Sequence, residues 1–168
     1  VLGCIVEKAS GVPLDKFLES HITGPLGMKD TYFYLPPEKK DRLAVAYGSD
    51  KKGKAVRQRE GARGQGHYVD GPRKSFSGGA GLLSTATDYA RFLQMLLNGG
   101  ELDGVRVLSP KTVQLMTTNH VDTLYQSGRQ GFGLGFSVLS DPGRAGIYGS
   151  PGAFGWGGAY FSTYLGEP

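Results

Sequence analysis

The chain has 168 residues, of which 39% are hydrophobic, and carries a formal net charge of +4. This length fits one domain that buries roughly 70% of its unfolded surface, and no apolar run reaches the roughly 18 residues that a membrane-spanning helix needs. The single cysteine excludes a disulfide framework and argues against a zinc site. Because Cys4 lies in the apolar stretch VLGCIV, we expect it to be buried.

The first part of the chain predicts two helices. The stretch VLGCIVEKASG is typical of the end of a helix, with Leu2, Ile5 and Val6 on one face and Gly11 as a left-handed C-cap. A second helix begins with Pro13 at its first position and ends at GPLGM. Its apolar side chains recur at helical spacing, at Leu14, Phe17, Leu18 and Ile22.

Residues 39–74 are strongly basic, with eleven Lys or Arg against four Asp or Glu. Such a surplus would suit a phosphate backbone. Within it the stretch GSDKKGKAVRQREGARGQGHYVDGPRK is rich in glycine, has little helical period and contains one aromatic residue, Tyr68. We therefore interpret 39–78 as a solvated basic loop and expect no nucleic-acid partner.

Two further helices follow the basic loop. Thr85 is placed as an N-cap, and Asp88 three residues later completes the spacing of a capping box. The glycines at 99–100 end this helix, and the next one begins with Ser109 as N-cap and Pro110 at its first position. The predicted buried stripe of the first of these helices consists of Tyr89, Phe92, Leu93, Leu96 and Leu97.

Strands are predicted only near the end of the chain. Apolar residues alternate with glycine through GFGLGFSVLS, which predicts one strand over 131–140. A last strand is predicted from about Phe154 to Tyr164, and it contains the sequence GWGG. Glycine weakens a strand unless a ligand or another backbone must come close. We therefore expect something to approach this strand closely.

The order of helices first and strands last indicates an α+β fold. Two strands do not form an independent sheet, and Val1 is not an initiator methionine. The sequence also stops at Gly-Glu-Pro, directly after a strand. We expect the sheet to be incomplete in this chain and the sequence to be a piece of a longer one.

Taken alone, the short motifs of the sequence do not identify a catalytic or metal-binding site. None of the three histidines has a second ligand at helical spacing, so no metal site is predicted. Ser49 and Lys52 match Ser-x-x-Lys formally, but they lie in a predicted turn, where the lysine amine is not placed to take the serine proton. A G-x-S-x-G motif is absent, and GFGLGF lacks the context of a phosphate loop.

Four segments together resemble the serine beta-lactamase-related family of class C beta-lactamases, D,D-peptidases and family VIII esterases. They are LGCIVEKASGVPLDKFLESHITGPLGMKDT, GGAGLLSTATDYARFLQMLLNGGELDGVRVLSPKTVQLM, GFGLGFSV and GSPGAFGWGGAYFSTY. The resemblance covers most of the chain and is weakest at 39–74. Tryptophan-glycine-glycine in place of lysine-threonine-glycine is most similar to the esterase branch.

The resemblance implies a division of the chain and a set of site residues. Residues 1–130 would form a mostly helical domain, and residues 131–168 strands of the α/β domain. Trp156, Gly157 and Gly158 correspond to the family's triplet beside the substrate, and Ala159 would offer its backbone N–H to the oxyanion hole. Gly79, in the turn SFSGGAG, would lie near the active-site rim. No cofactor is implied.

The departures from the family's pattern bear on activity. The nucleophilic Ser-x-x-Lys on a helix and the Tyr-x-Asn motif both have no counterpart in this chain. In the family both come earlier in the sequence, so the resemblance implies a parent hydrolase of ester or β-lactam substrates and a chain that is inactive alone. Two alternatives stay open: an inert or interaction-only chain, and a binder of anionic surfaces or nucleic acid through 39–74. The remainder of the same fold would be its partner.

Overall fold

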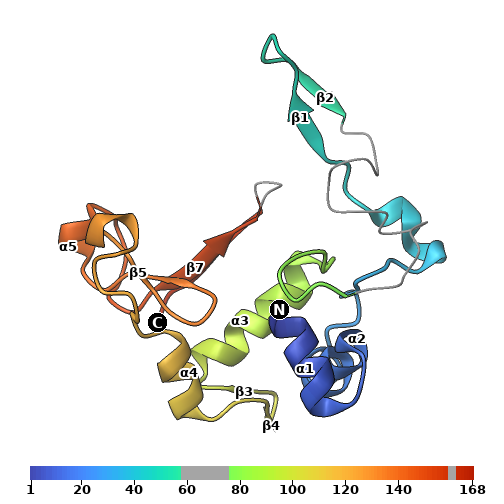
Figure 1. Cartoon of the computed structure of the whole chain (residues 1–168), viewed down its shortest axis with the longest axis horizontal. Helices are drawn as coiled ribbons and strands as arrows, with labels where there is room; N and C mark the ends of the chain where they lie inside the picture. Colours follow the sequence, from blue (N-terminus) through green and yellow to red (C-terminus); the bar gives the residue numbers. More distant parts are fainter. Residues whose placement is uncertain (58–75, 159–161) are drawn as a thin grey trace. The chain divides into compact units, whose positions relative to one another are not determined.

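A computed structural model describes residues 1–57, 76–158 and 162–168 of the chain (Figure 1). The chain divides into two compact units, Val1–Tyr89 and Ala90–Pro168, which are described in turn. Among the described residues, no helix is long and apolar enough to cross a membrane.

The first unit begins with two short helices that lie side by side (Figure 1). α1 (Leu2–Ser10) ends as predicted at Gly11, whose φ of 75° is left-handed and whose N–H donates to the Glu7 carbonyl. α2 (Leu14–Leu18) begins one residue later than predicted, because Pro13 is its N-cap. A π-helical turn, η1 (Glu19–Thr23), continues it.

The buried face of α1 is not the face that was predicted. Gly3 is its buried residue, and the face that carries Gly3 packs on the backbone of Gly78. Cys4 follows one residue later, about 100° further around the helix, and is exposed, so the prediction that it is buried was wrong. Leu2 and Ile5 are also exposed, at 74% and 55%.

The core of the first unit is small and lies beyond α1. Its buried apolar side chains are Leu14, Leu26, Met28 and Leu35. Tyr32 and Leu83 exchange backbone hydrogen bonds of 2.9 and 2.7 Å, which join the segment after η1 to the start of the next helix.

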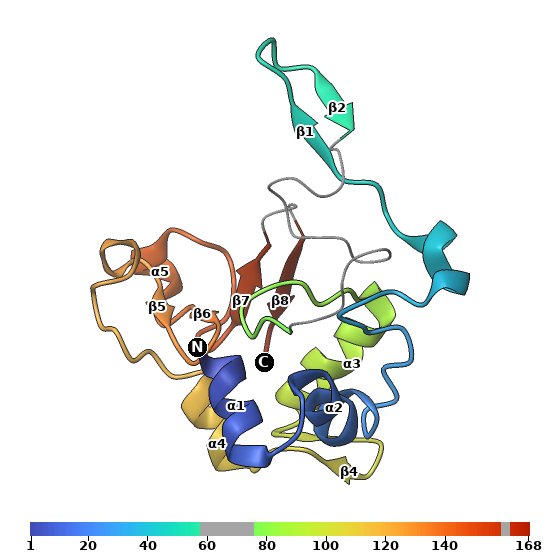
Figure 2. The same cartoon turned by 45° about the vertical axis from the view of Figure 1, so that its right-hand side comes forward.

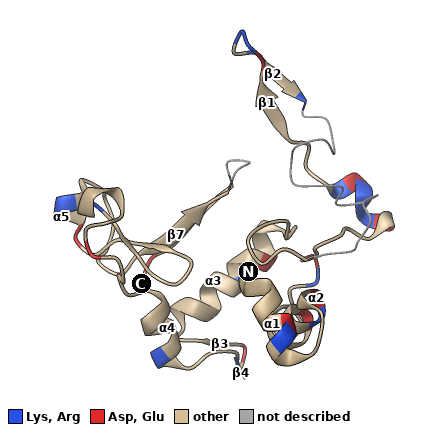
Figure 3. Ribbon diagram, in the orientation of Figure 1, with Lys and Arg blue, Asp and Glu red and all other residues tan. Residues whose placement is uncertain are grey.

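The predicted basic loop contains regular structure in its described part. A 3-10 helix, η2 (Pro37–Arg42), comes first. β1 (Tyr47–Ser49) and β2 (Ala55–Arg57) then pair as an antiparallel hairpin, whose turn carries lysines (Figure 3). The turn is built by Asp50, whose carboxylate accepts the N–H groups of Lys52 and Lys54. Residues 58–75 of the loop, with His67 and Tyr68, lie outside the described residues.

α3 (Ala86–Leu97) crosses from the first unit into the second. The Thr85 hydroxyl accepts the Asp88 N–H at 3.1 Å, which is one half of the predicted capping box. The other half was wrong: the Asp88 carboxylate is buried and accepts instead from the Asp30 N–H and the Thr31 hydroxyl, at 2.7 and 2.9 Å. It therefore joins α3 to the turn before η2.

The two helices predicted for this region are present, but only Leu96 of the five side chains in the predicted buried stripe is buried. Met95 and Leu96 are completely buried on α3, although Met95 was not part of the predicted stripe. Left-handed glycines at 99–100 end α3, and β3 (Glu101–Leu102) and β4 (Val105–Arg106) form an unpredicted hairpin. α4 (Pro110–Met116) has Ser109 as its N-cap, as predicted, and the serine hydroxyl accepts the Thr112 N–H.

Four short antiparallel strands in chain order form the sheet of the second unit (Figure 2): β5 (Gly131–Phe132), β6 (Ser137–Val138), β7 (Phe154–Gly157) and β8 (Thr163–Gly166). Each of the two predicted strands is thus a pair of strands. The first pair turns at Gly135, whose φ of 95° interrupts an extended chain. η3 (Gln126–Gly128) precedes the sheet, and α5 (Pro142–Ala145) lies between β6 and β7.

Helices combined with short antiparallel strands confirm the predicted α+β class. The core of the second unit lies between these elements and is formed by Met95, Leu96, Val113, Phe136, Val138, Leu139, Ala153 and Phe154. The predicted division at residue 130 separates helices from strands, whereas the two units are groups of residues that contact one another. That division stays a prediction.

Candidate active site

β7 presents one paired and one open edge at the predicted triplet. On one side Trp156 pairs with Tyr164 and Gly157 with Thr163, and the Gly158 N–H donates to the Ser162 carbonyl at 2.7 Å. On the other side the ladder with β6 covers only Phe154 and Gly155. Among the described strands, the edge of β7 at Trp156 and Gly157 therefore has no partner. An open strand edge can take an extended ligand as an additional strand.

The three glycines around Trp156 differ in how much room their surroundings leave for a side chain. A Cβ on Gly155 would overlap the Tyr164 carbonyl, and a Cβ on Gly158 would lie 2.5 Å from the Ser162 hydroxyl. A Cβ on Gly157 would meet nothing nearer than the Ser162 carbonyl, at an ordinary 3.8 Å. Neighbouring described atoms thus explain glycine at 155 and 158 but leave it unexplained at 157.

Trp156 belongs to a cluster of three aromatic rings, which we call the Trp156 cluster: Tyr125, Phe132 and Trp156. The Trp156 and Phe132 ring centroids are 5.0 Å apart with the rings nearly perpendicular. Tyr125 lies 5.2 Å from Phe132 and 6.2 Å from Trp156. Trp156 is 42% exposed, so its indole is not a core side chain. Tyr125 was not predicted as a site residue, because the sequence offers no periodic signal for it.

Asn119 holds the parts of the Trp156 cluster together. Its side-chain oxygen accepts the N–H groups of Val121 and Phe132 at 3.0 and 3.2 Å, and its amide donates to the Asp122 carbonyl at 3.1 Å. One side chain therefore fixes both the loop that leads to Tyr125 and the strand that carries Phe132. A Cβ on Gly131 would overlap this side chain, which explains the glycine that precedes Phe132.

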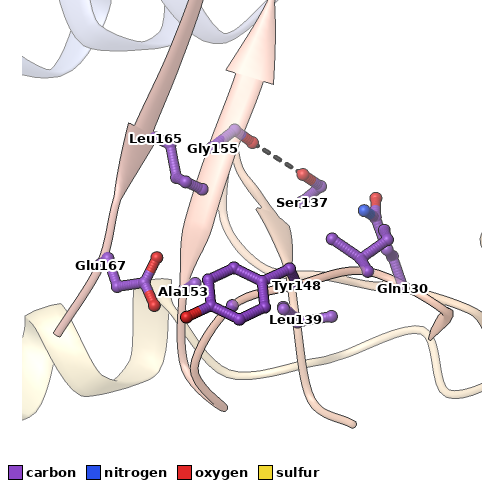
Figure 4. A pocket seen from close by; sticks show the side chains of 10 residues that line it. Gln130, Ser137, Leu139, Tyr148, Ala153, Gly155, Leu165 and Glu167 are labelled. Carbon is purple, nitrogen blue, oxygen red and sulfur yellow. Dashed lines mark hydrogen bonds between the residues drawn. The ribbon is translucent and has the colours of Figure 1, made fainter. Parts of the chain in front are cut away.

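A shallow pocket lies beside the strand residues Ser137, Ala153 and Gly155, with Leu139, Tyr148 and Glu167 also at its border (Figure 4). Successive strand residues point to opposite faces, so Gly155 and Trp156 belong to opposite faces of β7. The Ser137 hydroxyl donates to the Gly155 carbonyl at 2.8 Å, and Glu167 accepts from the Ser150 N–H and hydroxyl. The Ser137 hydroxyl is thus bonded to a backbone carbonyl, and Glu167 joins the end of the chain to the loop at Ser150.

Gly79 lies in the first unit, in a turn that packs against α1. Its neighbour Gly78 is held by close approach, since a Cβ there would lie 2.7 Å from the Gly3 nitrogen. Gly79 itself has room, because the nearest atom to its Cβ position is the Ser77 hydroxyl at 4.0 Å. Gly79 and the triplet belong to different units, so their proximity stays a prediction. Ala159 lies outside the described residues.

The remaining candidate residues are accounted for by local contacts. The Ser49 hydroxyl donates to the Asp50 carbonyl, and Lys52 lies in the hairpin turn, so this Ser-x-x-Lys match is the predicted turn. The His21 ring stacks on Phe17, and His120 Nε2 is hydrogen-bonded to the Leu115 carbonyl. In the described part of the chain, no group of three or more His, Cys, Asp or Glu is placed to hold a metal ion.

The strongest electrostatic feature is an ion-pair cluster in the first unit. Asp30 Oδ1 lies 2.5 Å from Lys39 Nζ, and Asp30 Oδ2 lies 2.8 Å from the Arg42 guanidinium. Hydrogen bonds from Arg42 and then Lys39 hold the pKa of the Asp30 carboxyl well below its ordinary value. The cluster fastens η2 to the segment after η1, and the Lys39 amine also donates to the Tyr32 hydroxyl at 2.6 Å.

Residues 1–166, which include β7 and the open edge, match the protein family described as Beta-lactamase. The chain belongs to the Beta-lactamase family. This confirms the resemblance inferred from the four segments and, with the similar structures, the predicted fold.

Two proteins and one solved structure are similar to the chain over almost its whole length. Protein Rv1367c of Mycobacterium tuberculosis is 38% identical over 181 residues, which cover 100% of the chain and 44% of that protein. Esterase EstB of Burkholderia gladioli is 32% identical over 182 residues, which cover 98% and 44%. The structure of EstCE1, a hydrolase with promiscuous acyltransferase activity, matches with a TM-score of 0.78 and 29% identity, covering 98% of the chain and 45% of EstCE1. The chain thus spans less than half the length of these relatives.

Proposed function

We propose that this chain forms the substrate-lining strand and helical part of a serine hydrolase that cleaves carboxylic esters through an acyl-enzyme. Gly157 carries the proposal: it lies on an open strand edge, and the packing of the described residues leaves room for a side chain that the sequence does not use. Glycine at such a position is explained by a ligand that must come close to the backbone. Esterase EstB and the hydrolase EstCE1 are similar over 98% of the chain, which supports this reading.

In the proposed reaction the acyl group of the ester lies along β7 beside Gly157 and Gly158. The Ala159 N–H then donates to the carbonyl oxygen as negative charge develops on it. One preorganised donor of this kind contributes about 3–4 kcal/mol to the stabilisation of the transition state. The small residues of the triplet allow the carbonyl to reach that donor.

Trp156 favours uncharged esters over anionic β-lactams. According to the resemblance, family members that act on β-lactams carry lysine at the position of Trp156. Lysine offers a fixed positive charge to a substrate carboxylate. An indole offers an apolar face and a single N–H donor instead. A carboxylate placed against it would lose its charge partner.

The proposal assigns the nucleophile and its base to sequence outside residues 1–168. The hydroxyls of Ser49, Ser77 and Ser137 all take part in local hydrogen bonds, as donor or acceptor, and Ser49 is separated from any helical lysine. We therefore expect the 168-residue chain alone to hydrolyse neither p-nitrophenyl butyrate nor a chromogenic cephalosporin above background.

Covalent labelling tests the proposal. The longer protein that contains this chain is treated with a fluorophosphonate, which reacts with activated serines, and the labelled peptide is mapped by mass spectrometry. We expect one labelled serine in a Ser-x-x-Lys sequence before Val1, together with loss of p-nitrophenyl butyrate hydrolysis. A label on Ser49 or Ser77 would refute the assignment of the nucleophile, and absence of both label and turnover would favour the inert alternative.

A further inference from the structure

We propose that Tyr125 and Phe132 complete, with Trp156, a binding site for the aromatic group of an aryl or benzyl ester. The inference rests on the proposed function and deepens it, since it names the substrate class. It derives from the geometry of the Trp156 cluster and from the backbone that supports it.

Trp156 is the most exposed ring of the cluster and lies at the open edge of β7. Perpendicular and tilted rings 5.0–6.2 Å apart present both ring faces and ring edges, which is the arrangement that a further aromatic ring prefers. Trp156 lies directly before Gly157, where the proposed acyl group passes. An aromatic group attached near the scissile bond would therefore reach the cluster.

A second aromatic cluster in the same unit is purely structural, and its exposure can be compared with that of the Trp156 cluster. Phe136 and Phe154 lie 5.2 Å apart in the core and are only 5% and 3% exposed. Tyr125 and Phe132, in contrast, are half-buried, and Trp156 is 42% exposed. The Trp156 cluster thus keeps its apolar surface open, although the sheet can bury aromatic rings completely.

The loop that carries Tyr125 is held in an unfavourable backbone conformation. Asp122, Gln126 and Ser127 have φ values of 49°, 50° and 55°, which non-glycine residues rarely adopt. Such residues concentrate at ligand-binding sites, where surrounding contacts enforce the conformation. Here the Asn119 amide donates to the Asp122 carbonyl, and the Gly128 N–H donates to the Tyr125 carbonyl at 2.9 Å. These hydrogen bonds hold the loop on both sides of Tyr125.

Binding is tested without relying on catalysis, through the fluorescence of Trp156, the single tryptophan of the chain. The longer protein is titrated with N-benzylacetamide, an unreactive amide that carries the ring, and with N-methylacetamide, which lacks it. Subtracting the signal of the Trp156→Phe variant isolates Trp156. We expect saturable binding of N-benzylacetamide, weakened about three- to tenfold by Tyr125→Ala or Phe132→Leu.

Tyr47→Ala is the control, because Tyr47 is an exposed tyrosine of β1 that belongs neither to the Trp156 cluster nor to the pocket beside β7. It should leave N-benzylacetamide binding unchanged. Equal affinity for both amides, or equal affinity in the Tyr125→Ala and Tyr47→Ala variants, would overturn the inference.

Ester selectivity separates this inference from the proposed function. If the longer protein hydrolyses esters and Tyr125→Leu lowers the ratio of kcat/KM for phenyl acetate over ethyl acetate, both stand. Hydrolysis with an unchanged ratio refutes the aromatic site and keeps the hydrolase. Ring-dependent amide binding in a protein that hydrolyses no ester keeps the aromatic site and refutes the hydrolase.

Discussion

Gly3 of α1 and Gly78 of the turn that follows the basic segment pack backbone against backbone. A Cβ on Gly78 would lie 2.7 Å from the Gly3 nitrogen, and a Cβ on Gly3 would lie 3.0 Å from the Gly78 nitrogen. The contact joins residues 75 positions apart in sequence and fixes one side of the turn that carries Gly79. Backbone atoms cannot move aside as a flexible side chain can.

Alanine at position 78 should therefore destabilise the protein, whereas alanine at position 79 should not. We expect Gly78→Ala to lower the free energy of unfolding by about 1–3 kcal/mol, the usual cost of overpacking. Gly79→Ala is the matched control, since its Cβ would have room, and should change stability by less than about 0.5 kcal/mol. Urea denaturation followed by circular dichroism measures both. Equal effects of the two substitutions would contradict the packing described for this turn.

The Asp30 ion pairs should make stability depend on acid. The pKa of the folded carboxyl is depressed, so its contribution is fully present above the unfolded value of about 3.9 and is lost as pH falls below that value. Asp30→Asn should lower the unfolding midpoint at pH 7, and the difference from the wild type should shrink at pH 3. Asp41→Asn is the control, since Asp41 lies on η2 between Lys39 and Arg42. A difference that stays constant between pH 7 and pH 3 would show that the ion pairs do not contribute.

Gly131 and Asn119 should be energetically coupled. Gly131→Ala places a methyl group on the Asn119 side chain and should cost about 1–3 kcal/mol. In an Asn119→Gly background the same substitution should cost clearly less, because glycine removes both the Cβ and the Cγ that the new methyl group would overlap. A double-mutant cycle from urea denaturation measures the coupling. Additive effects would show that Asn119 does not occupy this position.

Trp156 should set the preference between esters and β-lactams. In the longer protein, Trp156→Lys restores a positive charge on the open edge of β7 and should raise the ratio of kcat/KM for a chromogenic cephalosporin over p-nitrophenyl butyrate. Trp156→Leu is the control, since it removes the indole without adding charge. A ratio that rises equally in both variants would attribute the preference to size and not to charge.

Local signals in the sequence were sufficient for the helices. Gly11 and Ser109 act on their own neighbours, so their capping roles could be predicted from a few residues. The strands near the end of the chain were predicted at the right places but as two strands and not four, because GFGLGF alternates as a strand while Gly135 turns the chain. The hairpins β1–β2 and β3–β4 were missed. The partner of Asp88 was missed, since Asp30 lies 58 positions away and no local pattern connects them.

The candidate site divides in the same way. Trp156 and its glycines could be found from composition and from the resemblance, because the triplet is contiguous in sequence. Tyr125 and Asn119 could not, since their roles arise from a loop whose conformation depends on the hydrogen bonds to Phe132 and Asp122. Cys4 was misplaced because the apolar stretch around it says nothing of which helix face is covered.

Gly157 is the residue on which the proposed function depends most, and its role is tested by comparing activity with stability. In the longer protein, Gly157→Ala should lower kcat/KM for p-nitrophenyl butyrate by at least tenfold, because the methyl group occupies the path of the acyl group. The free energy of unfolding should change by less than about 0.5 kcal/mol, since the new Cβ would lie 3.8 Å from its nearest described neighbour. Thr163→Val, on the partner strand β8 opposite Gly157, should leave kcat/KM within about twofold. Full activity of Gly157→Ala at unchanged stability would contradict the claim that substrate passes along this edge of β7.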